Sequence, residues 1–161
     1  MSSHETFRGN VTTYTKDILS LVKDIKHDVL YLDPPYNTRQ YGPNYHLYET
    51  FVRNDNPQLS GKTGLRNWKN ESDSKFCSKP YCLNFLEEIT KSSNASWFFM
   101  SYNSDGLLSK DDILKSLSSC GYCCVCHEQP NRRYKADTSD SRKYNDGELY
   151  EYLFSASRNQ M

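Results

Sequence analysis

Val29-Leu30-Tyr31-Leu32-Asp33-Pro34-Pro35-Tyr36 is the stretch around which the chain is organised. The apolar run before Asp33 contains a β-branched residue and a tyrosine, which is typical of a buried strand. Two prolines then stop the strand, because proline lacks a backbone N–H and pushes the residue before it out of the helical region. The pattern therefore predicts a core strand that ends in a presented carboxylate, with Tyr36 at the tip of a stiff turn.

These residue types suit one kind of ligand, an exocyclic amino group on a planar base. The Asp33 carboxylate and the Pro34 carbonyl can accept its two N–H bonds, and the Tyr36 ring can stack on the base. Such a nitrogen is a poor nucleophile until acceptors hold its hydrogens beside an electrophilic methyl group. The turn, stiffened by Pro35, is therefore a candidate site for methylation of an amino nitrogen, and this chemistry needs no metal.

Two blocks of the sequence carry a family resemblance. Asp33-Pro34-Pro35-Tyr36 resembles the Asp-Pro-Pro-Tyr signature of the amino-methyltransferases, which use S-adenosylmethionine. The longer run 31–50, YLDPPYNTRQYGPNYHLYET, is similar to the Dam-like class of adenine-N6 DNA methyltransferases, and the block 97–106 stands where the next strand of that class is expected. A proline turn that merely closes an ordinary strand would not explain these flanking matches.

The resemblance implies an enzyme that methylates N6 of a flipped-out adenine in DNA and that is associated with restriction-modification. It implies that Asp33, Pro34, Pro35 and Tyr36 are catalytic. Methylation of cytosine N4 or of RNA is the alternative with the same chemistry. A non-catalytic remnant, or a DNA-binding or interaction subunit of a split methyltransferase, is the alternative from another class.

The apolar periodicity predicts an α/β domain. The resemblance implies that this domain is a partial Rossmann-like methyltransferase sheet with mostly parallel strands, an antiparallel C-terminal hairpin and helices on both faces. We expect a single domain, 1–161, with an insertion over 43–80 after the catalytic turn. Most of the irregular structure of this insertion is expected over 54–78. Strands are predicted at 10–15, from 29, and at 96–100, 122–127 and 149–156, and helices at 17–25, 45–52, 80–89 and 109–119.

Asp17 and Ile18 stand at the first predicted strand-to-helix turn. Ligands of open α/β sheets bind beyond the carboxyl ends of the strands, which places this pair near Asp33. The resemblance implies that Asp17, Ile18 and Asp33 contact the cofactor S-adenosylmethionine. Asp17 as a plain helix N-cap is the competing interpretation.

Basic and aromatic residues near the turn are candidates for contacts with DNA, since arginine offers a permanent charge and tyrosine a stacking face. A solvated insertion and a solvated hairpin loop are the competing interpretations for the two later groups. The candidates are Asn37, Arg39 and Tyr41 after the turn, Lys62 and Arg66 in the insertion, and Arg132, Arg133 and Lys135 in the loop before the last strand.

Composition sets further bounds. The 161 residues carry a formal net charge of zero, which excludes a uniformly basic nucleic-acid binder and leaves only local basic patches. No apolar run is long enough to span a membrane, so we expect a cytoplasmic protein. Among six cysteines, Cys120-x-x-Cys123 could suggest a zinc site, but a single such pair within a strand-like run favours free thiols and no metal.

One feature of the family is missing from the sequence. The resemblance implies a glycine-rich turn, Phe-x-Gly-x-Gly, that holds the cofactor, yet Gly9 is the only glycine before Asp33. We therefore expect this chain to match the C-terminal catalytic part of the family alone. It could be one half of a split enzyme whose partner carries the glycine-rich turn, a remnant of a truncated gene, or part of a longer product.

Overall fold

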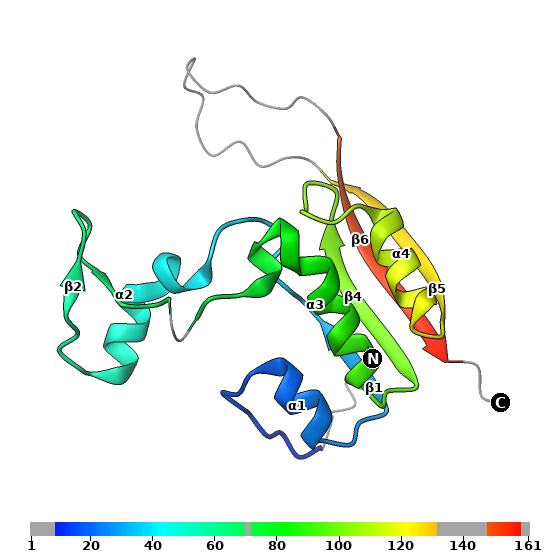
Figure 1. Cartoon of the computed structure of the whole chain (residues 1–161), viewed down its shortest axis with the longest axis horizontal. Coiled ribbons are helices and arrows are strands. Elements are labelled where there is room, and N and C mark those ends of the chain that lie inside the picture. The colour runs from blue at the N-terminus through cyan, green and yellow to red at the C-terminus, as the bar shows by residue number, and fades with distance from the viewer. Residues whose placement is uncertain (1–8, 70–71, 132–147, 159–161) are drawn as a thin grey trace, which may run out of the picture.

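The computed structural model describes residues 9–69, 72–131 and 148–158. Its larger elements form a mixed sheet with helices packed on it, while a smaller group lies to one side (Figure 1). In chain order the elements are α1 (Ile18–Asp24), β1 (Val29–Leu32), α2 (Tyr41–Arg53), β2 (Leu59–Ser60), β3 (Leu65–Arg66), the 3₁₀ helix η1 (Lys75–Cys77), α3 (Lys79–Ser92), β4 (Trp97–Asn103), α4 (Lys110–Ser119), β5 (Tyr122–Asn131) and β6 (Leu149–Arg158).

The main sheet has four strands in the order β1-β4-β6-β5. The pair β1 and β4 is parallel, with Leu32 opposite Met100, and α3 makes the crossover between them. Both other pairs are antiparallel, because β6 returns from β5 and inserts between β5 and β4. The C-terminal antiparallel hairpin is thus confirmed, but the prediction of mostly parallel strands is wrong.

One face of the sheet forms the core. Phe98 and Met100 of β4 lie opposite Ala156 and Phe154 of β6, and all four are at most 2% exposed. Helix α3 adds Leu86 to this cluster, and α3 packs against both α1 and α4. Because successive side chains of a strand alternate between faces, one face can be dry while the other meets solvent.

The opposite face of the sheet is open in the described part of the chain. Large apolar side chains on it are 41–58% exposed: Val29, Tyr31, Trp97, Val125 and Leu153. The prediction of helices on both faces is therefore wrong for the described residues. The reason is that the described helices around this sheet, α1, α3 and α4, all contribute to the same core cluster.

Residues 10–15 do not form the predicted strand. The segment has no regular structure, and Val11 is 83% exposed. A strand needs a hydrogen-bonded neighbour, and no backbone hydrogen bond of this segment is found within the described residues. The predicted unit of strand, helix and strand therefore reduces to α1 followed by β1.

The stretch predicted to be irregular, 54–78, contains a small hairpin and η1, and α2 begins four residues earlier than predicted. Strands β2 and β3 pair antiparallel, with Leu59 opposite Arg66. This hairpin packs on α2 beside the main sheet (Figure 1). Among the described helices, none has the length and apolar character needed to cross a membrane.

Candidate active site

The turn formed by Asp33, Pro34, Pro35 and Tyr36, the candidate catalytic turn, leaves the sheet at the end of β1, as the sequence predicts. Asp33 follows Leu32 directly, and its carboxylate is exposed whereas Pro34 is buried. One carboxylate oxygen, Oδ1, accepts a hydrogen bond of 2.7 Å from the Ser101 hydroxyl of β4. Because β1 and β4 are parallel neighbours, their carboxyl ends bring these two side chains together. Ser101 therefore orients the Asp33 side chain through Oδ1, and Oδ2 takes no part in this hydrogen bond.

The Pro34 carbonyl is the second acceptor that the sequence singled out. No hydrogen bond to this carbonyl is found within the described ranges. Each carbonyl oxygen can accept two hydrogen bonds, so this oxygen keeps its full capacity for a ligand. The turn thus offers a carboxylate oxygen and a carbonyl oxygen on adjacent residues, Asp33 and Pro34.

Tyr36 is held by its backbone, which leaves its ring available. Its carbonyl accepts from the Leu107 N–H at 2.8 Å and from the Tyr102 hydroxyl at 3.3 Å. The Tyr36 ring is 40% exposed and meets the Tyr102 ring edge to face, with 6.4 Å between the centroids. Tyr102 is 4% exposed, and burial raises the pKa of its phenol, which keeps the hydroxyl protonated and able to donate.

Gly106 makes this arrangement possible. A Cβ at this position would stand 2.1 Å from Cε1 of Tyr102, far inside any contact distance. The backbone of the loop after β4 therefore approaches the Tyr102 ring as only glycine allows. Tyr102 and Gly106 both belong to the block 97–106, which carries part of the family resemblance, but their role in holding Tyr36 was not predicted.

A first cavity gathers the predicted cofactor residues. Asp17, Ile18 and Asp33 line one space of about 450 Å³ together with Pro34 and Pro35. Asp17 is also the N-cap of α1, because its carboxylate accepts from the Ser20 N–H at 3.0 Å. The two interpretations of Asp17 left open by the sequence are therefore compatible.

Two phenylalanines complete the wall of this cavity and escaped sequence analysis. Phe76 of η1 and Phe85 of α3 are buried and meet edge to face at 5.2 Å. The Lys75 ammonium lies 4.9 Å from the centroid of the Phe85 ring. Phe85 lay in the predicted helix 80–89 and Phe76 in the stretch predicted as irregular, so no local signal in the sequence marks either as a site residue.

A second cavity lies against the other residues of the turn. Tyr36, Asn37 and Arg39 line a space of about 510 Å³ with Asn103 and Asp105 from the end of β4 and the loop after it. Asn103 is 5% exposed, and its side-chain oxygen accepts from the Asp105 N–H. The structure thus joins the predicted residues Asn37 and Arg39 to Tyr36.

The segment after the turn is clamped by an amide. The Gln40 side chain donates to Asp73 at 2.6 Å and to the Ser74 carbonyl at 3.1 Å, and it accepts from the Ser74 N–H at 2.9 Å. The Cys77 thiol adds a contact to the Arg39 carbonyl. This clamp fixes the first cavity's rim, since Asp73 and Ser74 line that cavity.

The remaining residues that were predicted to contact DNA differ in how exposed their side chains are. Tyr41 begins α2 with its ring 53% exposed, and Lys62 is exposed in the turn of the β2–β3 hairpin. Arg66 is 7% exposed, and its guanidinium donates to both carboxylate oxygens of Asp55 and to the Thr50 hydroxyl. This placement gives Arg66 a structural role, whereas Arg132, Arg133 and Lys135 lie outside the described residues.

The cysteines are free in the structure, and Cys77 and Cys82 are buried. Burial raises the pKa of both thiols. Within the described ranges, no group of three or more His, Cys, Asp or Glu side chains could hold a metal ion.

A family model described as "D12 class N6 adenine-specific DNA methyltransferase" matches residues 2–110. The chain is 40% identical over 141 residues to the type II methyltransferase M.NlaIII of Neisseria lactamica, which covers 87% of this chain and 41% of that protein. It is 40% identical over 144 residues to the type II methyltransferase M.FokI of Planomicrobium okeanokoites, covering 88% and 22%. It is 38% identical over 144 residues to the type II methyltransferase M.CviAII of Paramecium bursaria Chlorella virus 1, covering 88% and 40%.

The chain therefore spans between about a fifth and two fifths of the length of these relatives. No solved structure matches the chain.

Proposed function

The chain belongs to the D12 class of N6 adenine-specific DNA methyltransferases, and we propose that it supplies the catalytic turn for methyl transfer from S-adenosylmethionine to N6 of an adenine extruded from DNA. The observation that carries the proposal is that one fixed turn presents two acceptor groups, the Asp33 carboxylate and the Pro34 carbonyl, together with the exposed ring of Tyr36. Asp33 is oriented by Ser101, the Pro34 carbonyl keeps its acceptor capacity, and Tyr36 is anchored through its backbone.

In the proposed reaction, Asp33 and the Pro34 carbonyl accept the two N–H bonds of the adenine amino group, and the Tyr36 ring stacks on the base. This geometry directs the nitrogen lone pair out of conjugation and toward the methyl group. As the N–C bond forms and the S–C bond breaks, one amino proton becomes acidic, and Asp33 is the acceptor within reach. No group on the protein needs to form a covalent intermediate.

The cofactor fits the first cavity. When bound, S-adenosylmethionine supplies an electrophilic methyl group on a sulfonium. The carboxylates of Asp17 and Asp33 suit hydroxyl groups and positive charge, while Ile18 and the phenylalanine pair Phe76 and Phe85 offer an apolar wall for a planar base. The volume of about 450 Å³ is within the range of ligand cavities.

DNA is the proposed substrate, and the second cavity faces it. We assign Asn37 and Arg39 to the target nucleotide because they line that cavity with Tyr36. Tyr41 and Lys62 are exposed on the adjoining segment, which suits contacts with the flanking DNA. Arg132, Arg133 and Lys135 remain candidates for backbone contacts.

We also propose that a further half of the methyltransferase fold, carrying the glycine-rich turn, completes the sheet. Strand β1 pairs with β4 on one side and has no second neighbour among the described strands. The open face of the sheet is lined by the exposed apolar side chains of Val29, Tyr31 and Trp97. A free edge beside an apolar face is the surface that an additional strand and helix would cover. The type II names of the relatives favour a restriction-modification setting.

Calorimetric titration with S-adenosylmethionine, first with the chain alone and then with the glycine-rich half, tests the cofactor site. Methyl transfer is then measured as N6-methyladenine in DNA by mass spectrometry. The Asp33→Ala variant should lose transfer while DNA binding stays nearly intact, whereas Asp111→Asn, an exposed carboxylate of α4, should leave both unchanged.

Transfer retained by Asp33→Ala in an assembly that binds the cofactor would refute the assignment of Asp33. DNA binding without transfer by the wild-type assembly would instead support the non-catalytic DNA-binding subunit. A product methylated at cytosine N4 would show that the target base is cytosine and not adenine.

A further inference from the structure

Three tyrosines form a row along α2, and the proposed reaction does not use them. Tyr41, Tyr45 and Tyr48 are spaced by four and three residues, so they share one side of the helix. Their side chains are 53%, 55% and 69% exposed. Neighbouring rings lie 5.6 Å and 6.3 Å apart between centroids. We call these three residues the tyrosine row.

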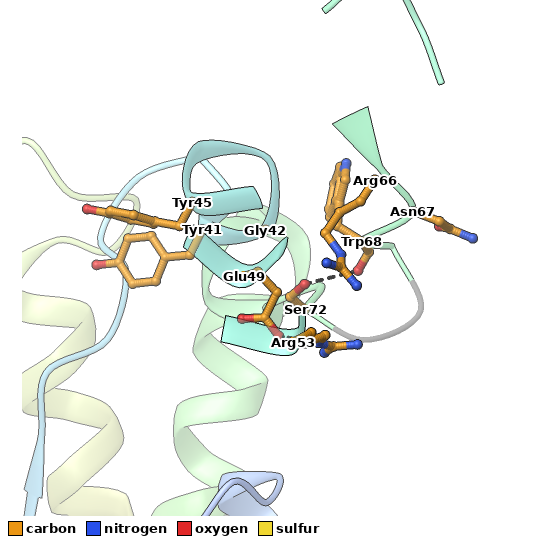
Figure 2. Close-up of a pocket in the computed structure, with 9 residues that line it drawn as sticks. All are labelled: Tyr41, Gly42, Tyr45, Glu49, Arg53, Arg66, Asn67, Trp68 and Ser72. Atoms are coloured by element: carbon orange, nitrogen blue, oxygen red, sulfur yellow. Dashed lines mark hydrogen bonds and ion pairs between the residues drawn. The ribbon is translucent and has the colours of Figure 1, made fainter. Parts of the chain in front are cut away.

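The row does not hold α2 in place. Helix α2 has no buried residue, and its anchors lie on another side, where Trp68 packs against Gly42 and Arg66 bonds to Thr50. Figure 2 shows the rings of Tyr41 and Tyr45 projecting together, away from Arg66 and Trp68. A row of exposed aromatic rings that does not pack against the core adds little to the stability of a surface helix. Such rows are typical of a binding surface.

The row begins at the catalytic turn. Tyr41 stands five positions after Tyr36, and its ring lies close enough to Asp33 for that carboxylate to contribute, after burial, to the raised pKa of the Tyr41 phenol. The row then runs along α2 toward the β2–β3 hairpin side of the molecule. A strand that enters the site at Tyr36 would therefore meet Tyr41, Tyr45 and Tyr48 in turn.

The segment of the chain that carries the row has a formal charge that suits a polyanion. Residues 37–69 contain five Lys or Arg and two Asp or Glu, a formal charge of +3, although the complete chain is neutral. Positive charge along a path of exposed aromatic rings is the arrangement by which proteins bind single-stranded nucleic acid. Phosphates meet the basic side chains while the bases stack on the rings.

We propose that the tyrosine row is a stacking track for unpaired nucleotides next to the target adenine, on the strand from which that adenine is extruded. This inference rests on the proposed function and names the form of DNA that the segment recognises. Extrusion of a base unstacks its neighbours, and aromatic rings beside the site can accept them. Every base has a π face, so the track holds the strand without reading its sequence.

Binding of a fluorescein-labelled oligonucleotide to the full chain tests the proposal by anisotropy. The probe is a 12-nucleotide strand of C and T only, compared with its duplex, and S-adenosylmethionine is left out so that no methyl group can be transferred. The wild type should prefer the single strand. Tyr45→Leu/Tyr48→Leu should weaken that binding about tenfold or more, because it removes two stacking faces. Tyr45→Phe/Tyr48→Phe keeps the faces and should stay within about twofold of the wild type.

Tyr81→Leu is the matched control, since Tyr81 is an exposed tyrosine, 62% exposed, that belongs to α3 and not to α2. The leucine pair should also leave the salt dependence of binding unchanged, because phosphate contacts set that slope. Equal binding by the leucine pair and the wild type, or no binding by the wild type, would overturn the proposal. Loss of self-association in the leucine pair with unchanged oligonucleotide binding would overturn it in favour of a protein interface.

The two proposals fail separately. If the assembly that contains the glycine-rich half transfers no methyl group but the leucine pair still loses oligonucleotide binding, the proposed function fails and the stacking track stands. If transfer proceeds equally in the wild type and in the leucine pair, with equal kcat/KM, the proposed function stands and the track fails.

Discussion

Replacement of Gly106 by alanine is the sharpest test of how the site is built. The added Cβ would stand 2.1 Å from Cε1 and 2.6 Å from Cζ of Tyr102, where ordinary carbon contacts need about 3.5–4.0 Å. The Tyr102 ring cannot simply retreat, because its hydroxyl donates to the Tyr36 carbonyl and accepts from the Leu108 N–H. We therefore expect an overpacking cost of about 1–3 kcal/mol in the free energy of unfolding.

Urea unfolding followed by circular dichroism measures this cost, and Tm should fall by about 2–4 °C for each kcal/mol. The same substitution in a Tyr102→Leu background should cost less, because the clashing ring atoms are gone. Gly61→Ala is the control: Gly61 has φ +72° and nothing within 4 Å of its added Cβ, so its cost comes from the backbone alone. A cost for Gly106→Ala below about 0.5 kcal/mol, or one independent of Tyr102, would refute the reasoning.

Gln40→Leu should loosen the contact with Asp73 and raise amide hydrogen exchange in residues 72–78, because the variant loses the three hydrogen bonds of the clamp; exchange rates equal to those of the wild type would contradict this role. The hydrogen bond from Arg66 holds the pKa of Asp55 below its ordinary value of 3.8. The ion pair of Arg66 and Asp55 therefore stabilises the folded state fully at pH values above 3.8, and this stabilisation is lost as the pH falls through the lower pKa of the folded state. Arg66→Gln should then make the free energy of unfolding depend less steeply on pH in the acid range. An unchanged dependence would argue against the pair. Finally, Cys82 is fully buried with a raised thiol pKa and should react with a thiol reagent only after denaturant is added, whereas early labelling detected by mass spectrometry would exclude this packing.

The strand that leads into the candidate site, and the family of the chain, were predicted from the sequence. The apolar run into Asp33 and the two prolines predicted a strand that ends in a carboxylate, and β1 confirms it. The family resemblance is confirmed by the match to residues 2–110. Local signals suffice here because strand propensity, proline stereochemistry and a contiguous motif all act over a few neighbouring residues.

Only the tertiary structure decided the order of the strands in the sheet and which distant residues contact the turn. Insertion of β6 beside β4 made the sheet mainly antiparallel, and nothing local to 149–158 distinguishes an inner strand from an edge strand. Residues 10–15 have strand propensity but no strand, because a strand is stabilised by a neighbour that the segment itself does not contain.

The contacts that hold the candidate catalytic turn also come from the tertiary structure. Ser101, Tyr102 and Phe85 reach the turn or its cavity from positions about 50 to 70 residues away, through the parallel pairing of β1 and β4 and the packing of α3. The sequence by itself determined which atoms could do chemistry, because covalent neighbours bring them together. The tertiary structure alone decided which distant side chains orient those atoms, because these contacts follow from strand pairing and packing, which depend on the whole chain.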